Sequence, residues 1–170
     1  DVKRTFLKHT DRDDLPGDFL RAVERFKIRG SSGKLNIALD RLPEFPAAPA
    51  GAPFLRGDMH CSTSLAELER AYDDWKDGRW SQSPYFDMLI PSQIDPAMAP
   101  PGSHMMTVFV QYAPYDLEVD GVRDAANWTE ERRRAFADCV LDKMSAACPD
   151  IKERVQHVEI RSPLELETEV

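Results

Sequence analysis

Two short apolar runs separated by a proline-rich segment constrain most strongly how this chain folds. The runs cover Tyr85–Ile90 and His104–Tyr112, and both are too short to span a membrane but have the length and residue types of sheet strands. Between them, Pro91–Gly102 contains Asp95-Pro96 and Pro100-Pro101-Gly102, which oppose regular structure and favour turns. The stretch therefore predicts two strands joined by a stiff, irregular loop.

The remaining elements predict an α+β fold with a mostly antiparallel sheet that helices cover on one side. Alternating apolar residues predict further strands at Lys34–Asp40 and Gln156–Arg161, and a short strand is predicted at Arg56–Cys61. Apolar residues spaced by three and four predict helices over Leu15–Phe26, after Ser64 and after Thr129. We expect two connections without regular structure, an extended proline-rich one at Leu42–Pro53 and a polar loop at Tyr115–Trp128 with a turn at Asp120-Gly121.

Helix starts are marked by capping boxes, in which a small polar residue precedes Glu by three positions. The pairs are Ser64 with Glu67, Asp150 with Glu153, and Ser162 with Glu165. After Ser64, the stripe Leu65, Leu68, Tyr72 and Trp75 is expected to be the buried face, and Gly78 to end the helix. After Thr129, the expected buried stripe is Phe136, Val140, Met144 and Ala147.

Composition and charge exclude several classes of function. The 170 residues are 42% hydrophobic and 31% charged, which is typical of a folded domain. A net charge of −8 argues against nucleic acid or an anionic membrane surface as the main partner. No run of apolar residues is long enough for a transmembrane segment. The three cysteines form no CxxC pair, which argues against a disulfide framework and predicts a reducing compartment.

The ends of the chain predict that it is one domain, residues 1–170, of a longer protein. It begins at Asp1-Val2-Lys3 without a methionine, and only five residues follow the strong helix start at Ser162–Glu165. A strong helix-start signal followed by so few residues is expected where the sequence is part of a longer polypeptide.

No motif of a reaction centre occurs in the sequence. There is no GxGxxG, HExxH or GxSxG pattern, and Gly30–Lys34 lacks the spacing of a phosphate-binding loop. No two histidines stand four residues apart, so no metal site is predicted.

Six residues are candidates for lining a ligand pocket, each with a plainer alternative. For His60, ordinary packing or a surface hydrogen bond is the more common role, against a substrate or redox role. Met88, Met106 and Phe109 belong to a soft apolar stretch that fits core packing first and the wall of a hydrophobic pocket second. Gln111 and Tyr112 end the strand and would orient a ligand or satisfy nearby backbone groups.

Three segments resemble the middle portion of phytoene dehydrogenase-like FAD-dependent oxidoreductases. They are Phe26–Phe45, Met88–Tyr115 and Arg161–Glu167, and the pattern PSxxDPxxAPPG from Pro91 to Gly102 is the most specific part. Within that family the sequence is most similar to the subgroup of pyridine nucleotide-disulfide oxidoreductase domain-containing protein 2, near the carotenoid desaturases and isomerases. The resemblance covers the chain from about residue 19 onward.

The resemblance implies the substrate-binding domain of a two-domain flavoprotein. The GxGxxG fingerprint and the segment that completes the flavin site would then lie outside this chain, so the complete protein would bind FAD and this fragment alone would not. Its partners would be the flavin-binding domain of the same polypeptide and an apolar, polyene or lipid-like substrate, held by the sheet over the flavin's reactive face. The fragment alone would be inactive, and the protein would reside in the cytoplasm or, in a eukaryote, the mitochondrial matrix.

A different class of function is a non-catalytic binding or assembly module with an apolar interaction surface. A free-standing small enzyme is the least favoured of the three, because the chain carries no catalytic motif.

Overall fold

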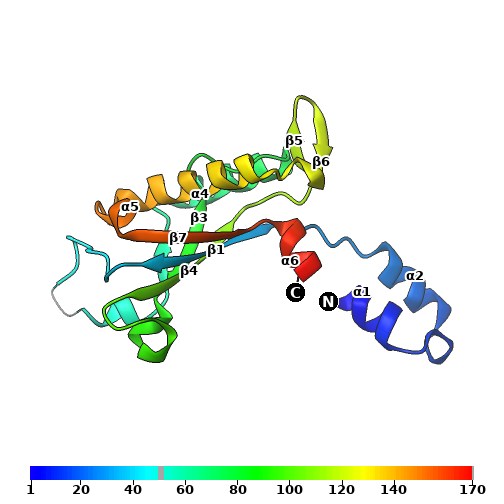
Figure 1. Cartoon of the computed structure of the whole chain (residues 1–170). Coiled ribbons are helices and arrows are strands. Elements are labelled where there is room, and N and C mark those ends of the chain that lie inside the picture. Colours follow the sequence, from blue (N-terminus) through cyan, green and yellow to red (C-terminus); the bar gives the residue numbers. More distant parts are fainter. Residues whose placement is uncertain (50–51, 170) are drawn as a thin grey trace.

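The computed structural model describes residues 1–49 and 52–169, and a five-stranded antiparallel sheet forms its centre (Figure 1). The strand order is β2-β3-β4-β1-β7. The strands are β1 Ser32–Leu39, β2 Met59–Cys61, β3 Tyr85–Leu89, β4 His104–Gln111 and β7 Val155–Arg161. The predicted α+β class, the antiparallel sheet and both strands of the apolar stretch are confirmed.

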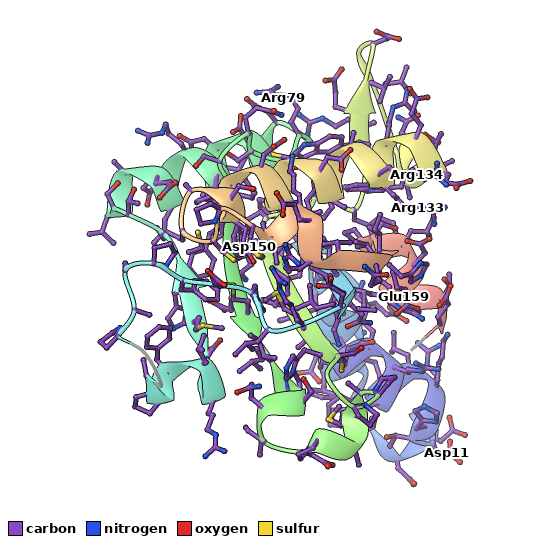
Figure 2. All side chains as sticks on the ribbon, turned by 60° about the vertical axis from the view of Figure 1, so that its left-hand side comes forward. Asp11, Arg79, Arg133, Arg134, Asp150 and Glu159 are labelled. Atoms are coloured by element: carbon purple, nitrogen blue, oxygen red, sulfur yellow. The ribbon has the colours of Figure 1, made fainter. Side chains whose placement is uncertain are left out.

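Six α-helices accompany the sheet: α1 Val2–Arg4, α2 Gly17–Arg25, α3 Leu65–Lys76, α4 Glu130–Ser145, α5 Ile151–Arg154 and α6 Pro163–Glu169. The box before α6 forms as predicted, because the backbone amide of Ser162 donates to Glu165 Oε2 at 2.8 Å. The box before α5 was predicted wrongly. Asp150, labelled in Figure 2, makes no side-chain cap and instead accepts a hydrogen bond from the Glu44 amide at 3.1 Å.

The core lies between one face of the sheet and α4. Strand alternation buries the side chains of Leu35, Ile37 and Leu39 toward that face. Helix α4 supplies Phe136 and Val140, which are fully buried in the same cluster. Figure 1 shows α4 and α5 on this side of the sheet, so the predicted one-sided helical cover is confirmed.

The predicted buried face of α3 was wrong. Leu65 is 81% exposed and Tyr72 is 39% exposed, whereas Glu67 and Ala71 are buried. Two features explain why α3 turns a different face toward the core. Glu67 forms an ion pair with Lys143 of α4 at 2.8 Å, and the small side chain at Ala71 allows close packing. The cap itself is as predicted, since the Glu67 amide donates to Ser64 Oγ at 3.2 Å.

The expected polar loop at Tyr115–Trp128 is a β-hairpin instead. Strands β5 Leu117–Val119 and β6 Val122–Asp124 pair antiparallel across the predicted Asp120-Gly121 turn. Both turn residues have positive φ, 51° and 82°, which suits the right-handed twist of a two-residue hairpin. The turn signal was correct, but the strands beside it are too short and polar to show in the sequence.

The proline-rich segment is not wholly irregular, because it holds single 3₁₀ turns at Pro91–Gln93 and Pro96–Met98. Ser92 anchors it to β4, since its Oγ accepts a hydrogen bond from the Met105 amide at 3.1 Å. Of the predicted extended connection Leu42–Pro53, positions 50 and 51 lie outside the described residues.

The N-terminal helices form a small unit that stands away from the sheet and is joined to β1 by an extended segment (Figure 1). Phe6 and Phe19 pack edge to face with ring centroids 5.0 Å apart. Within the predicted stripe of α2 only Val23 is buried, whereas Phe26 is 55% exposed. The helical period was correct, but the described residues offer this helix little to pack against.

Candidate functional site

The two faces of the sheet differ in cover and in chemistry. The face opposite α4 carries the alternate residues of each strand, and of the described α-helices only the short α6 reaches it, at the β7 edge, where Glu169 pairs with Arg161 (Figure 1). Strand register aligns one cross-sheet row of these side chains: His60, Asp87, Phe109, Lys34 and Arg161. Phe109, at the centre of this row, is 43% exposed. We call this surface the open face, and it is the main candidate for a binding surface.

One end of the open face holds a hydrogen-bonded cluster of His60, Tyr85 and Asp87. His60 and Asp87 are cross-strand partners in β2 and β3, which places their side chains side by side. The Tyr85 hydroxyl donates to Asp87 Oδ1 at 2.5 Å and lies 3.0 Å from His60 Nδ1. His60 Nδ1 also contacts Asp87 Oδ1 directly. Two polar groups, one from each of two adjacent strands, therefore meet at a single carboxylate.

The electrostatics of this cluster favour a charged imidazole and a protonated phenol. The hydrogen bond to Asp87, and then its negative charge, raise the pKa of His60 above its usual value. The same carboxylate, through its hydrogen bond, raises the pKa of Tyr85 to about 12. Tyr85 is thus a hydrogen-bond donor at neutral pH, and Asp87 is held as an acceptor.

A polar ladder crosses the other half of the open face. Thr107 Oγ1 donates to Asn36 Oδ1 at 3.1 Å, and Asn36 Nδ2 donates to Glu159 Oε2 at 2.7 Å. Glu159, labelled in Figure 2, also pairs with Arg161 at 2.6 Å on the edge strand β7. The hydrogen bond from Asn36, followed by that from Arg161, lowers the pKa of Glu159. These hydrogen bonds and the ion pair hold the polar side chains of this half of the face in defined positions.

A cavity of about 520 Å³ lies where the proline-rich segment overhangs the open face. Its lining includes Met98 and Pro100 from that segment, with Ala38, Met105 and Asn36 from β1 and β4. The proline-rich segment thus forms a wall at one end of the open face, and this end is more apolar than the end with His60.

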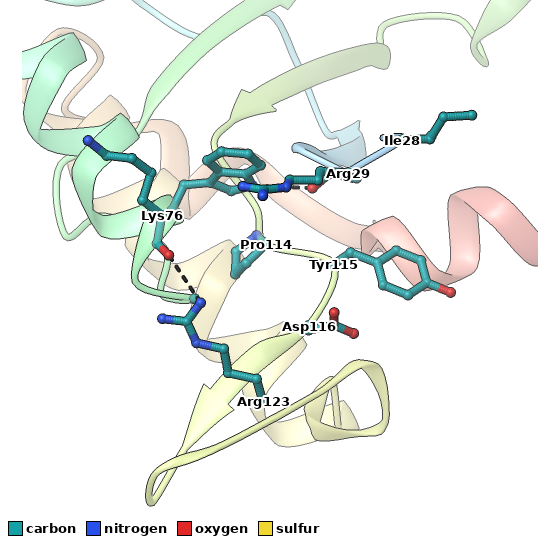
Figure 3. A pocket seen from close by; sticks show the side chains of 10 residues that line it. Ile28, Arg29, Lys76, Pro114, Tyr115, Asp116 and Arg123 are labelled. Carbon is teal, nitrogen blue, oxygen red and sulfur yellow. Dashed lines mark hydrogen bonds between the residues drawn. The ribbon is translucent and has the colours of Figure 1, made fainter. Parts of the chain in front are cut away.

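A second cavity, of about 310 Å³, lies at the junction of α3, the hairpin and the start of β1 (Figure 3). Its hydrogen bonds join these elements: Trp75 Nε1 donates to the Gly30 carbonyl at 3.2 Å, and Arg123 Nη1 donates to the Lys76 carbonyl at 3.1 Å. Because Trp75 and Arg123 of its lining hold the junction together, we assign this cavity a structural role.

The structure does not bring the six predicted pocket residues together. His60, Phe109 and Gln111 lie on the open face. Met88 and Met106 lie on the covered face, where they are 4% and 0% exposed within the core. Tyr112 follows the end of β4 and packs against the rings of Tyr72 and Trp75, with centroids 5.4 and 6.1 Å away.

Sequence reasoning missed Tyr85 and Asp87 because it treated Tyr85–Ile90 as one apolar run. The alternation was nevertheless present: Phe86 and Met88 are buried, while Tyr85 and Asp87 between them are partly exposed. An acidic residue inside an otherwise apolar strand is the signal that would have identified the open face.

Comparison with known proteins identifies relatives of this chain but no matching family model. No protein-family model matches the chain. The chain is 37% identical over 169 residues to the mouse (Mus musculus) protein named pyridine nucleotide-disulfide oxidoreductase domain-containing protein 2, and 37% identical over 170 residues to the rat (Rattus norvegicus) protein of that name. Each alignment covers 96% of this chain but 28% of the relative.

The predicted similarity to this subgroup is confirmed, and the chain spans somewhat more than a quarter of the length of these relatives. The printed name of these relatives is that of oxidoreductase domain-containing proteins. Among the described helices, none has the length and apolar character that crossing a membrane requires.

Proposed function

We propose that this chain is the substrate-binding part of an FAD-dependent oxidoreductase and that its open face is the wall of the substrate chamber. The observation that carries the proposal is the difference between the sheet faces: α4 covers one, while the other leaves Phe109 43% exposed. An uncovered sheet face with ordered polar side chains is expected where a second domain closes a ligand site. The 37% identity to the oxidoreductase domain proteins supports the same assignment.

The flavin would be held by parts of the polypeptide outside this chain. No two of the eight glycines stand two positions apart, as the first pair of GxGxxG requires, and the sheet in the described residues is antiparallel, so the chain does not fit a dinucleotide cradle. The partner that completes the site is therefore a flavin-binding domain of the same longer protein. The contribution of this chain is to bind the substrate, orient it and exclude water.

The chemistry of the open face suits a substrate with a large apolar portion. Phe109 and Leu89 are 43% and 39% exposed, and Met105 lines the cavity beneath the proline-rich segment. A polyene or lipid-like molecule would pack on these side chains, as in the phytoene dehydrogenase-like family that the sequence resembles. Gln111 and the His60 cluster would orient the molecule.

The second candidate function is a non-catalytic binding or assembly module. The exposed apolar side chains of the N-terminal unit favour it, since Phe26 and Ile28 are 55% and 51% exposed. In this case the flavin-binding domain, where present, would be structural.

Flavin content tests the flavoenzyme assignment. We expect the 170-residue chain, mixed with equimolar FAD and passed over a size-exclusion column, to elute without flavin absorbance. A polypeptide of the relatives' full length that contains this chain should purify yellow, because it carries the missing cradle. A longer protein that is colourless and cannot be reconstituted with FAD would contradict the flavoenzyme assignment and leave the binding module as the better account.

A further inference from the structure

The end of the open face that holds His60 also gathers two carboxylates. Asp58 lies just before β2, two residues from His60, and Asp87 is the cross-strand partner of His60. Each of the three offers one ligand atom, and these atoms all lie within 4.8 Å of one another. His60 and Asp87 face each other across β2 and β3, and β3 is itself paired to β4, so the sheet hydrogen bonds fix the spacing of these two side chains, with Asp58 directly before β2.

In the described residues, the only cationic partner of these carboxylates is the His60 imidazole. Among the described residues, the ion pairs give Asp87 only His60 as a partner and give Asp58 none. The Tyr85 hydroxyl donates to Asp87 Oδ1 at 2.5 Å, which orients that carboxylate but adds no charge. Two carboxylates and an imidazole nitrogen therefore converge with no lysine or arginine among them.

This donor set matches a transition metal better than an alkaline-earth ion. Zn²⁺ accepts nitrogen and carboxylate oxygen ligands at about 2.0 to 2.2 Å, and three protein ligands leave a further position for water or another ligand. Mg²⁺ prefers octahedral oxygen and keeps several of its waters, so an imidazole is a poor ligand for it. A hydrogen bond from outside to a ligating carboxylate, such as that from Tyr85, is the usual support for such a site.

We propose that Asp58, His60 and Asp87 bind one divalent transition metal ion, with Zn²⁺ as the best match, and that Tyr85 positions Asp87 for it. His60 has 58% of its side chain exposed, so the ion enters from solvent without any rearrangement of the core. The proposal uses only residues of this chain and does not depend on flavin binding, so either proposal can fail without the other.

The test is a titration of the 170-residue chain with ZnCl₂ by isothermal calorimetry and with CoCl₂ by visible absorption. We expect one equivalent to bind, with ligand-field bands for Co²⁺. His60→Ala and Asp87→Asn should each weaken binding by at least about tenfold. Mg²⁺ should bind more weakly than Zn²⁺ by a similar factor or more.

The matched control is His157→Ala, because His157 lies on the same face of the sheet, opposite Ala38, but outside the cluster. This variant should bind Zn²⁺ as the unaltered chain does. Absence of saturable binding at one equivalent, or an equal loss in His157→Ala, would overturn the proposal. Each variant should melt at a temperature close to that of the unaltered chain, since His60 and His157 are exposed and Asp87 is partly exposed, and weaker binding would then report the missing ligand.

Discussion

Replacing Lys143 with methionine is expected to lower the free energy of unfolding by about 3 to 5 kcal/mol, because it leaves a buried carboxylate without its cation. Lys143 Nζ lies 2.8 Å from Glu67 Oε1, and the two side chains are 10% and 8% exposed. Urea unfolding at pH 7 measures the loss. The matched control is Arg134→Met in the same helix, whose ion pair with Glu130 is mostly exposed and worth about 0 to 1 kcal/mol.

The effect is large because Glu67 joins three parts of the chain. Its carboxylate accepts hydrogen bonds from the Thr63 amide at 2.7 Å and from Ser83 Oγ at 2.5 Å, in addition to the contact with Lys143. Lys143 Nζ also donates to the Pro84 carbonyl at 2.7 Å. Equal losses in Lys143→Met and Arg134→Met would contradict this account of the pair.

The Glu67–Lys143 pair should also make the stability of the chain depend on pH. The hydrogen bond from Lys143, then those from Ser83 and the Thr63 amide, hold the pKa of Glu67 far below its usual value of 4.5, although burial acts in the opposite direction. A carboxylate whose pKa is depressed on folding stabilises the protein above its unfolded pKa, and that stability is lost as the pH falls below it. The stability advantage over Glu67→Gln should therefore be constant near neutral pH and shrink below about pH 4.5.

The second large effect is expected for Phe136→Ala, at about 3 to 5 kcal/mol, because the substitution leaves a cavity in the core. The ring of Phe136 is fully buried and packs edge to face against Trp80 and Trp128, with centroids 5.8 and 5.5 Å away. It also packs so closely on β1 that a Cβ added at Gly33 would stand 2.8 Å from it.

The control for Phe136→Ala is the same substitution on the open face. Phe109 is 43% exposed, so Phe109→Ala should cost well under half as much in urea unfolding of the same 170-residue chain. Similar losses at the two positions would show that the open face is packed as tightly as the core, contrary to the structure.

Much of the fold could be predicted from local pattern. Alternation placed β1 and β7, the two short apolar runs placed β3 and β4, and the Ser162–Glu165 box placed α6, because these patterns are properties of a few adjacent residues. The buried face of α3 was not predictable in this way. It depends on an ion pair between Glu67 and Lys143, which stand far apart in the sequence.

The candidate site was predictable only in part, for the same reason. Phe109, Gln111 and His60 were identified, but a list of apolar residues cannot separate the two faces of a buried-looking strand, so Met88 and Met106 were grouped with them. Asp87 joins His60 only through the register of β2 on β3, which pairs residues more than twenty positions apart, whereas Asp58 stands two positions before His60 in the sequence.

The central claim is that the open face looks into a chamber closed by the flavin-binding part of a longer protein, and alkylation of a cysteine placed at Phe109 tests it most directly. We expect Phe109→Cys to react rapidly with a maleimide in the 170-residue chain and about tenfold or more slowly in the polypeptide of the relatives' length. Glu130→Cys, on the exposed surface of α4, should react with the maleimide at the same rate in both proteins. Peptide mass spectrometry distinguishes the introduced thiols from the native ones, which are Cys61, Cys139 and Cys148. Equal reactivity of Phe109→Cys in the two proteins would contradict the claim.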